Sequence, residues 1–175
     1  MKRWYGFLLP LTLTVLGCNS EIDRQLKEID SLYPYIEPNI VLDSLPRSTD
    51  SLLIAFGKQH PKHKRSENFV HRAIDIKLKK GMHLQAAKWA VYYLETFKSN
   101  PTHRLENAVM GAHHFEQHQV FDQALKLYKI IVNEFPEEDI ADQAKQMIYF
   151  IEKGLITPEQ QLNYLLEQKK NKWRF

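Results

Sequence analysis

The chain has 175 residues, of which 43% are hydrophobic, with a formal net charge of +3 and a single cysteine. This length allows one domain with a sizeable core, and a lone cysteine cannot form an intramolecular disulfide, so stability must come from packing. The near-neutral charge indicates no nucleic-acid partner, and a polar composition with only six glycines argues against a β-barrel or β-sandwich.

The first 17 residues have the pattern of an export signal peptide. Lys2 and Arg3 precede residues 4–17, which carry no charge. A membrane-spanning helix needs roughly 20 apolar residues, and Pro10 would interrupt a helix here, so we expect cleavage rather than spanning. Loss of the two basic residues would lower the net charge to +1.

The predicted signal ends in Val15-Leu16-Gly17-Cys18, which resembles the lipobox of bacterial lipoproteins. The resemblance implies cleavage before Cys18 and acyl chains on this residue, which anchor the protein to a membrane. Asn19 stands where an inner-membrane retention signal has Asp, so the implied location is the outer membrane, on its periplasmic face. The alternatives are a buried structural cysteine and an ordinary signal peptide that happens to end near a cysteine.

Residues 18–50 are predicted to form a lipidated tether and docking segment. A short helix is expected here, and residues 33–38 cannot continue it because they contain two prolines. Its apolar stripe consists of Ile22, Leu26, Ile29 and Tyr33.

Residues 51–175 are predicted to form one helical-repeat domain. A short helix with Leu52, Leu53 and Phe56 is expected to stop at Gly57. The basic loop that follows, residues 58–65, could touch phosphate or lipid headgroups, but we interpret it as a solvated connector.

Amphipathic helices are expected from Ser66, as N-cap, to the C-terminus. Their predicted ends are marked by glycine or proline: Gly81, Asn100-Pro101, Pro136 and Gly154. Thr157-Pro158-Glu159-Gln160 predicts a capping box that opens a last helix. Its apolar face holds Leu162, Leu165 and Leu166.

A shift of 35 residues superposes one part of this region on the next. It places Val70 on Leu105, Ala73 on Ala108, Ile74 on Val109, Tyr93 on Tyr128 and Pro101 on Pro136. A period near 34 with a closing proline resembles the tetratricopeptide family. The second copy, residues 105–138, has the family's small and aromatic positions: Ala112, Phe115, Ala124 and Tyr128. The first copy departs from the pattern, with Lys77 at a small position and Trp89 opposite Ala124.

The resemblance implies an all-α fold of antiparallel helix pairs stacked as a short right-handed solenoid. Similar envelope members include the helical-repeat lipoprotein of the β-barrel assembly machinery and the periplasmic coordinator of the Tol-Pal system, which are scaffolds. In that family the inner helices line a groove that grips partner segments. Applied to the second copy, the resemblance implies a partner-binding groove formed by Glu106, Val109, His113, Glu116 and Gln117. The implied function is a membrane-anchored protein-interaction scaffold with envelope proteins as partners.

Histidine is the one residue type whose spacing suggests chemistry. His114 and His118 are one helical turn apart, so His113, His114 and His118 define an alternative function, metal binding. This is not the zincin motif, because Phe115 follows His114, and we interpret the histidines as polar residues on a solvated or groove face. The sequence contains no nucleotide-binding glycine loop, nucleophile elbow or paired-carboxylate motif, so we expect neither an enzyme nor a cofactor.

Overall fold

The computed structural model describes residues 13–32, 46 and 48–172, with side chains for 20–32, 46 and 48–170. These residues form eight α-helices and no strand, which confirms the all-α prediction. The helices are α1 (Leu13–Ser31), α2 (Thr49–Gln59), α3 (Ser66–Lys79), α4 (His83–Thr96), α5 (Pro101–Gln117), α6 (Phe121–Glu134), α7 (Asp139–Glu152) and α8 (Pro158–Lys172).

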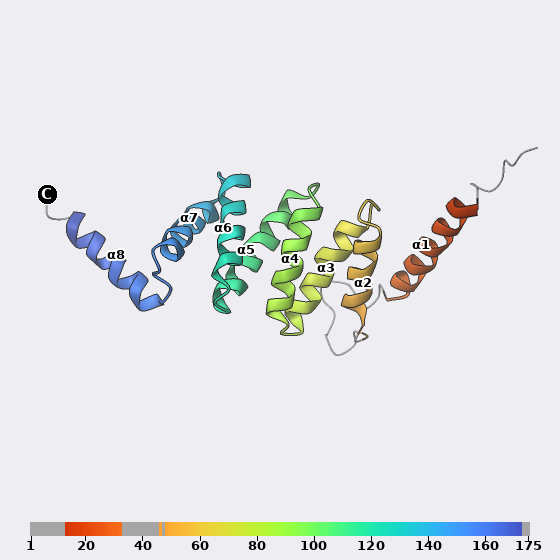
Figure 1. Ribbon diagram of the computed structural model, residues 1–175, viewed down its shortest axis with the longest axis horizontal. Helices are drawn as coiled ribbons and strands as arrows, with labels where there is room; N and C mark the ends of the chain where they lie inside the picture. The colour runs from red at the N-terminus through yellow and green to blue at the C-terminus, as the bar shows by residue number, and fades with distance from the viewer. Residues whose placement is uncertain (1–12, 33–45, 47, 173–175) are drawn as a thin grey trace, which may run out of the picture.

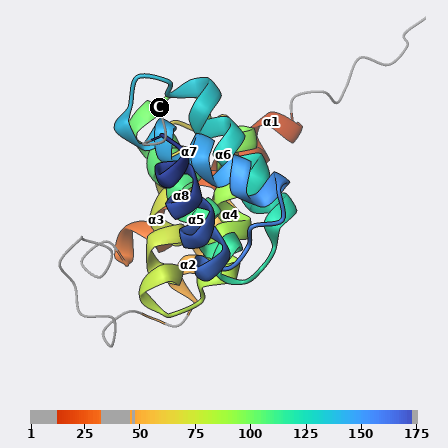
Figure 2. The ribbon, with the colours of Figure 1, turned by 90° about the vertical axis from the view of Figure 1, so that its left-hand side faces the viewer.

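The helices are arranged in a row that follows their order in the sequence (Figure 1). From α2 to α7, each helix packs mainly against the helices before and after it in the chain. α1 and α8 lie at the two ends of the row, and Figure 2 looks along it from the α8 end. The short connections predicted from the sequence therefore bring consecutive helices side by side.

The main core consists of small residues where helices cross and larger side chains beside them. Ala112 and Ala124, the small positions predicted from the sequence, are fully buried, and the predicted aromatic Phe115 is 1% exposed. A second core joins α1, α2 and α3, and Ile29 of α1 is fully buried in it. The predicted stripe of α1 thus packs against the folded body, while its last member, Tyr33, lies outside the described residues.

Several predicted helix ends are confirmed. Gly81 and Gly154 follow α3 and α7 with φ values of +71° and +70°, a conformation that glycine adopts without strain. Asn100 caps α5 by accepting a hydrogen bond from the backbone of His103 at 3.0 Å. At the start of α8, Thr157 Oγ1 accepts from Gln160 N at 3.2 Å, and Gln160 Oε1 accepts from Thr157 N at 3.0 Å. The predicted capping box is therefore present.

Two predicted helix boundaries are wrong. Gly57 does not end α2, which continues to Gln59; it is buried, and a Cβ atom there would collide with Val70 Cγ2 of α3. Glycine therefore permits close helix packing here instead of terminating the helix. Ser66 is the first residue of α3 and not its N-cap, and its hydroxyl donates to the carbonyl oxygen of His60 at 2.5 Å.

If α3 and α4 form one helix pair and α5 and α6 the next, the single shift of 35 residues superposes α3 on α5 but does not superpose α4 on α6. α3 and α5 begin 35 residues apart, at Ser66 and Pro101, but α5 has 17 residues and α3 has 14. Because α5 is nearly one turn longer, α4 and α6 begin 38 residues apart. This second shift places Ala86 on Ala124 and Tyr93 on Ile131, all fully buried, so the predicted pairing of Tyr93 with Tyr128 is wrong.

Candidate functional site: a groove between α5 and α7

A groove of about 640 Å³ lies between α5 and the beginning of α7. Its apolar lining comes from both helices: Leu105, Val109, Met110 and Ile140. The acidic residues Glu106, Glu138 and Asp139 and the histidines His113 and His114 complete it. The groove thus combines an apolar surface with carboxylates along its edges.

A second hollow of about 270 Å³ adjoins the groove, since His113 lines both. Glu116 and Gln117 of α5 line this second hollow together with residues of the turns before α6 and α8. The five positions predicted for the groove therefore all line one of two neighbouring hollows along α5. The structure thus divides the five positions between the groove, with Glu106, Val109 and His113, and the second hollow, with His113, Glu116 and Gln117, and their binding of a partner stays a prediction.

The acidic residues of the groove differ in how they are paired. Glu116 accepts a hydrogen bond from the hydroxyl of Tyr128 at 2.5 Å, and burial together with this bond raises the pKa of Tyr128. The Glu106 carboxylate lies 3.6 Å from His71 Nε2 and its side chain is 57% exposed. Among the residues that the structure describes, no cationic side chain pairs with Glu138 or Asp139. Glu138 and Asp139 stand at the start of α7, where the positive end of the helix dipole offsets part of their charge. Since no side-chain cation of the described residues neutralises the rest, this part of the groove attracts basic groups.

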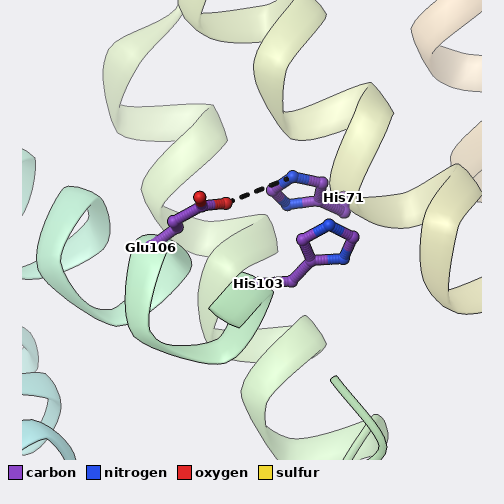
Figure 3. A group of neighbouring side chains, drawn as sticks. All are labelled: His71, His103 and Glu106. Atoms are coloured by element: carbon purple, nitrogen blue, oxygen red, sulfur yellow. Dashed lines mark ion pairs between the residues drawn. The ribbon is translucent and has the colours of Figure 1, made fainter. Parts of the chain in front are cut away.

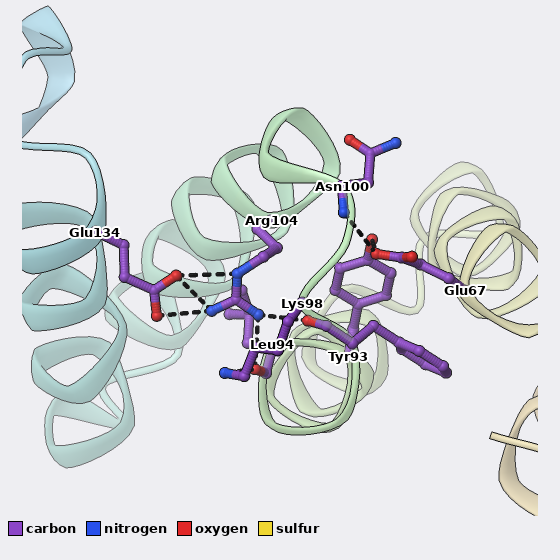
Figure 4. Close-up of polar contacts among 8 residues, drawn as sticks. Glu67, Tyr93, Leu94, Lys98, Asn100, Arg104 and Glu134 are labelled. Carbon is purple, nitrogen blue, oxygen red and sulfur yellow. Dashed lines mark hydrogen bonds and ion pairs between the residues drawn. The ribbon is translucent and has the colours of Figure 1, made fainter. Parts of the chain in front are cut away.

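Polar contacts at the turn between α4 and α5 hold α5 in position (Figure 4). The guanidinium of Arg104, a residue 3% exposed, donates to the carbonyl oxygens of Leu94 and Phe97 at 2.8 and 2.5 Å. On its other side, Arg104 Nε and Nη2 donate to the Glu134 carboxylate of α6 at 2.9 and 2.7 Å. Arg104 thus joins the C-terminal end of α4 to α6, directly beside the first groove residues of α5.

Glu67 of α3 fixes the same turn from the opposite side (Figure 4). Its carboxylate accepts from the hydroxyl of Tyr93 at 2.8 Å and from the backbone N–H of Asn100 at 3.1 Å. Burial would raise the pKa of Glu67, but these hydrogen bonds and the one from Ser99 hold it below its usual value. The groove residues of α5 therefore project from a helix that α3, α4 and α6 all restrain.

The three histidines of the alternative function do not converge. His114 stacks on His83 with ring centroids 4.6 Å apart, and its Nδ1 lies 3.2 Å from Gln117 Oε1. His118 Nδ1 lies 2.8 Å from the carbonyl oxygen of His114, to which it donates. Within the described part of the chain, the group of possible metal ligands that does meet is a different one, composed of His71, His103 and Glu106.

This second group lies between α3 and α5, beside the groove (Figure 3). Its three ligand atoms lie within 4.8 Å of one another, and the rings of His71 and His103 stack at 3.9 Å with an interplanar angle of 12°. Asn107 Nδ2 lies 3.1 Å from His71 Nδ1 and donates to the carbonyl oxygen of His103 at 2.8 Å. The sequence did not indicate this group, because its histidines are far apart in the chain and neither lies in a recognisable motif.

The geometry fits a stacked, hydrogen-bonded histidine pair better than a metal centre. The nitrogen lone pairs of imidazole lie in the ring plane, so two nearly parallel stacked rings do not point toward one ion. Because Asn107 Nδ2 can only donate, His71 Nδ1 accepts, and the His71 proton then resides on Nε2, facing Glu106. Burial lowers the pKa of His71, and neighbouring His103 lowers it further, against the opposing effect of Asp75 and Glu106. His71 is thus a hydrogen-bonded contact between α3 and α5.

The predicted anchor lies at the edge of the described region. α1 runs through the predicted cleavage site between Gly17 and Cys18, but the Cys18 side chain and residues 1–12 lie outside what the structure describes. In the described residues, none of the helices has the length and apolar character needed to cross a membrane.

Comparison with known proteins gave no match. Neither a protein-family model, nor a curated protein, nor a solved structure matches this chain.

Proposed function

We propose that this chain is a lipid-anchored interaction scaffold of the bacterial cell envelope, built as a tetratricopeptide-like right-handed solenoid. The lipobox-like segment ending at Cys18 supports the anchor. The row of consecutively packed helices and the pattern of residues 105–138 support the solenoid.

The observation that carries the proposal is the groove between α5 and α7. Its apolar lining can bury the hydrophobic face of a partner segment, and the unpaired carboxylates of Glu138 and Asp139 favour basic residues beside that face. The partner that fits this groove best is therefore an amphipathic segment with apolar and basic side chains, helical when bound.

Anchoring and groove binding would act together. A scaffold confined to a membrane meets partners in the same layer at a raised effective concentration, so a groove of modest affinity suffices. The proposed mechanism is therefore tethering and recognition, with no chemical step and no cofactor.

The test is capture of partners by cross-linking the native lipidated protein in cells, followed by mass spectrometry. The variant carries Glu106→Lys and Glu116→Lys, which reverse one charge in the groove and one in the adjoining second hollow. A matched control carries Asp122→Lys and Asp142→Lys, which change the net charge equally at exposed positions that do not line the groove. We expect an envelope protein to be captured by the wild type and the control and lost from the groove variant. Equal capture by both variants would contradict a role for the groove.

A further inference from the structure

The C-terminal end of the row exposes apolar side chains that the N-terminal end does not. All the large hydrophobic residues that the described chain exposes lie in α7, α8 and the turn between them: Tyr149, Ile156, Leu162, Leu165 and Leu166. At the other end, α1 buries Ile29 against α2 and α3. Because helical-repeat proteins need a polar surface on their terminal helices to stay soluble, the α8 end requires a cover.

α8 meets the rest of the protein along one narrow side. The Tyr164 ring lies 5.3 Å from that of Tyr149, and Gln161 Nε2 donates to the carbonyl oxygen of Leu155 at 3.0 Å. At about 3.6 residues per turn, the three leucines share one face of α8, and Leu165, one turn after Gln161, stands at the border between that face and the contact side. Leu162, Leu165 and Leu166, predicted from the sequence as the apolar face of the last helix, are accordingly 56%, 42% and 48% exposed.

We propose that this leucine face of α8 pairs antiparallel with the same face of a second copy of the chain. A two-fold axis passing between residues 164 and 165 places Leu165 beside Leu165 of the second copy. The same axis places Leu162 opposite residue 167 of the second copy, next to Leu166 of that copy. A symmetric contact of this kind is self-complementary and closes after two subunits.

The charges of α8 support this orientation. Glu159 stands in the first turn and Lys170 in the last, and at 3.6 residues per turn both lie on the same flank of the leucine face. In the antiparallel pair, Glu159 of each copy faces Lys170 of the other, giving two ion pairs that a parallel pair would not form. Two antiparallel helices also oppose their dipoles. This pairing uses a surface outside the groove and does not depend on the proposed function.

The first experiment is disulfide cross-linking of the full-length chain in lysates of the cells that produce it, without separating membrane and soluble fractions. Leu165→Cys places two thiols beside the two-fold axis, so mild oxidation is expected to give a covalent dimer on non-reducing electrophoresis. Glu167→Cys, an exposed position on the opposite side of the same helix, is the matched control and is expected to remain monomeric. Wild type gives the background, because Cys18 is its only cysteine.

Charge reversal then tests the register. In the Leu165→Cys background, Glu159→Lys is expected to lower the dimer yield about fivefold, and adding Lys170→Glu is expected to restore it. Recovery in the charge-swapped variant excludes unfolding of α8 as the cause of the loss. Three results would overturn the proposal: no dimer above background, cross-linking of Leu165→Cys to another protein only, or a yield that Lys170→Glu does not restore.

Discussion

A buried charge links α2 to the end of α3. Asp50 is 3% exposed, and its carboxylate oxygens lie 2.6 Å from Lys77 Nζ and 2.5 Å from Lys80 Nζ. Burial alone would raise the pKa of Asp50, but the two lysines hold it below its ordinary value of 3.8. Lys77, which departs from the repeat pattern, is therefore explained by an acidic partner that lies 27 residues earlier in the chain.

Asp50→Ala is expected to destabilise the fold by about 3 kcal/mol, because it leaves Lys77 buried without a counter-charge. Urea unfolding followed by circular dichroism measures this free energy. Asp142→Ala is the control, since the exposed pair of Asp142 with Lys145 is worth about 0.5 kcal/mol. Similar losses in the two variants would mean that the Asp50 contact contributes no more than a surface ion pair.

Stability is expected to depend on pH through His71. The pKa of His71 is lower in the folded chain than its ordinary value of 6.5, chiefly because of burial. As the pH falls below 6.5, the unfolded chain therefore binds the proton first, and the free energy of unfolding decreases.

Thermal unfolding midpoints measured at about pH 7.5 and about pH 5.5 test this dependence. His71→Gln is expected to show a smaller decrease than the wild type. Part of the decrease should remain, because burial also lowers the pKa values of His63 and His114. An identical decrease in wild type and variant would assign the pH dependence to other groups.

Helix positions were largely predictable from local signals, whereas their mutual packing was not. Pro101, Gly81 and the Thr157 capping box mark ends through backbone constraints that act within a few residues. Gly57 was misassigned because a glycine that permits close packing and a glycine that ends a helix look alike in a sequence. The register of α4 and α6 was missed because α5 is nearly one turn longer than α3, and apolar periodicity alone does not fix helix length.

Gly57→Ala is expected to destabilise the protein by about 1–3 kcal/mol, because its Cβ would collide with Val70 of α3. In an uncrowded helix the same change would stabilise the protein by roughly 1 kcal/mol. The sign of the change in unfolding free energy therefore shows whether Gly57 is crowded by Val70. Chemical denaturation measures it. Val70→Ala makes room for the new methyl group, so the double variant is expected to lose less stability than the two single losses combined.

At the scale of the whole molecule, the positions that α5 contributes to the groove could be predicted, whereas the contacts that other helices make around them could not. The five predicted positions fall at helical spacing on one helix, so a correct position for α5 places them together. The contribution of Ile140 and Asp139, and the stacking of His71 on His103, arise between different helices. Such contacts depend on how helices are placed relative to one another, and a single sequence read by periodicity does not contain that information.

The proposed membrane anchor gives a prediction for the entire chain. Cys18→Ala is expected to move the protein from the membrane fraction to the soluble fraction and to abolish the mass increase due to acylation. Fractionation with immunoblotting and intact-mass spectrometry measure both effects. Ser20→Ala, two residues away, is the control and is expected to leave the protein in the membrane. Membrane retention of the Cys18→Ala protein at the wild-type level would contradict lipid anchoring.

Packing between helices that are consecutive in the sequence also determines how the molecule unfolds. When each helix contacts mainly the preceding and following ones, unfolding need not be all-or-none and can begin at an end of the row. Within one copy of the chain α8 has the fewest partners, so the amide hydrogens of monomeric protein are expected to exchange with solvent first in α8 and last in α4 and α5, as hydrogen-exchange mass spectrometry would show. Since α6 and α7 separate α8 from α5, fraying of the last helix is expected to leave the groove helix folded, and the proposed partner binding would then be insulated from local melting.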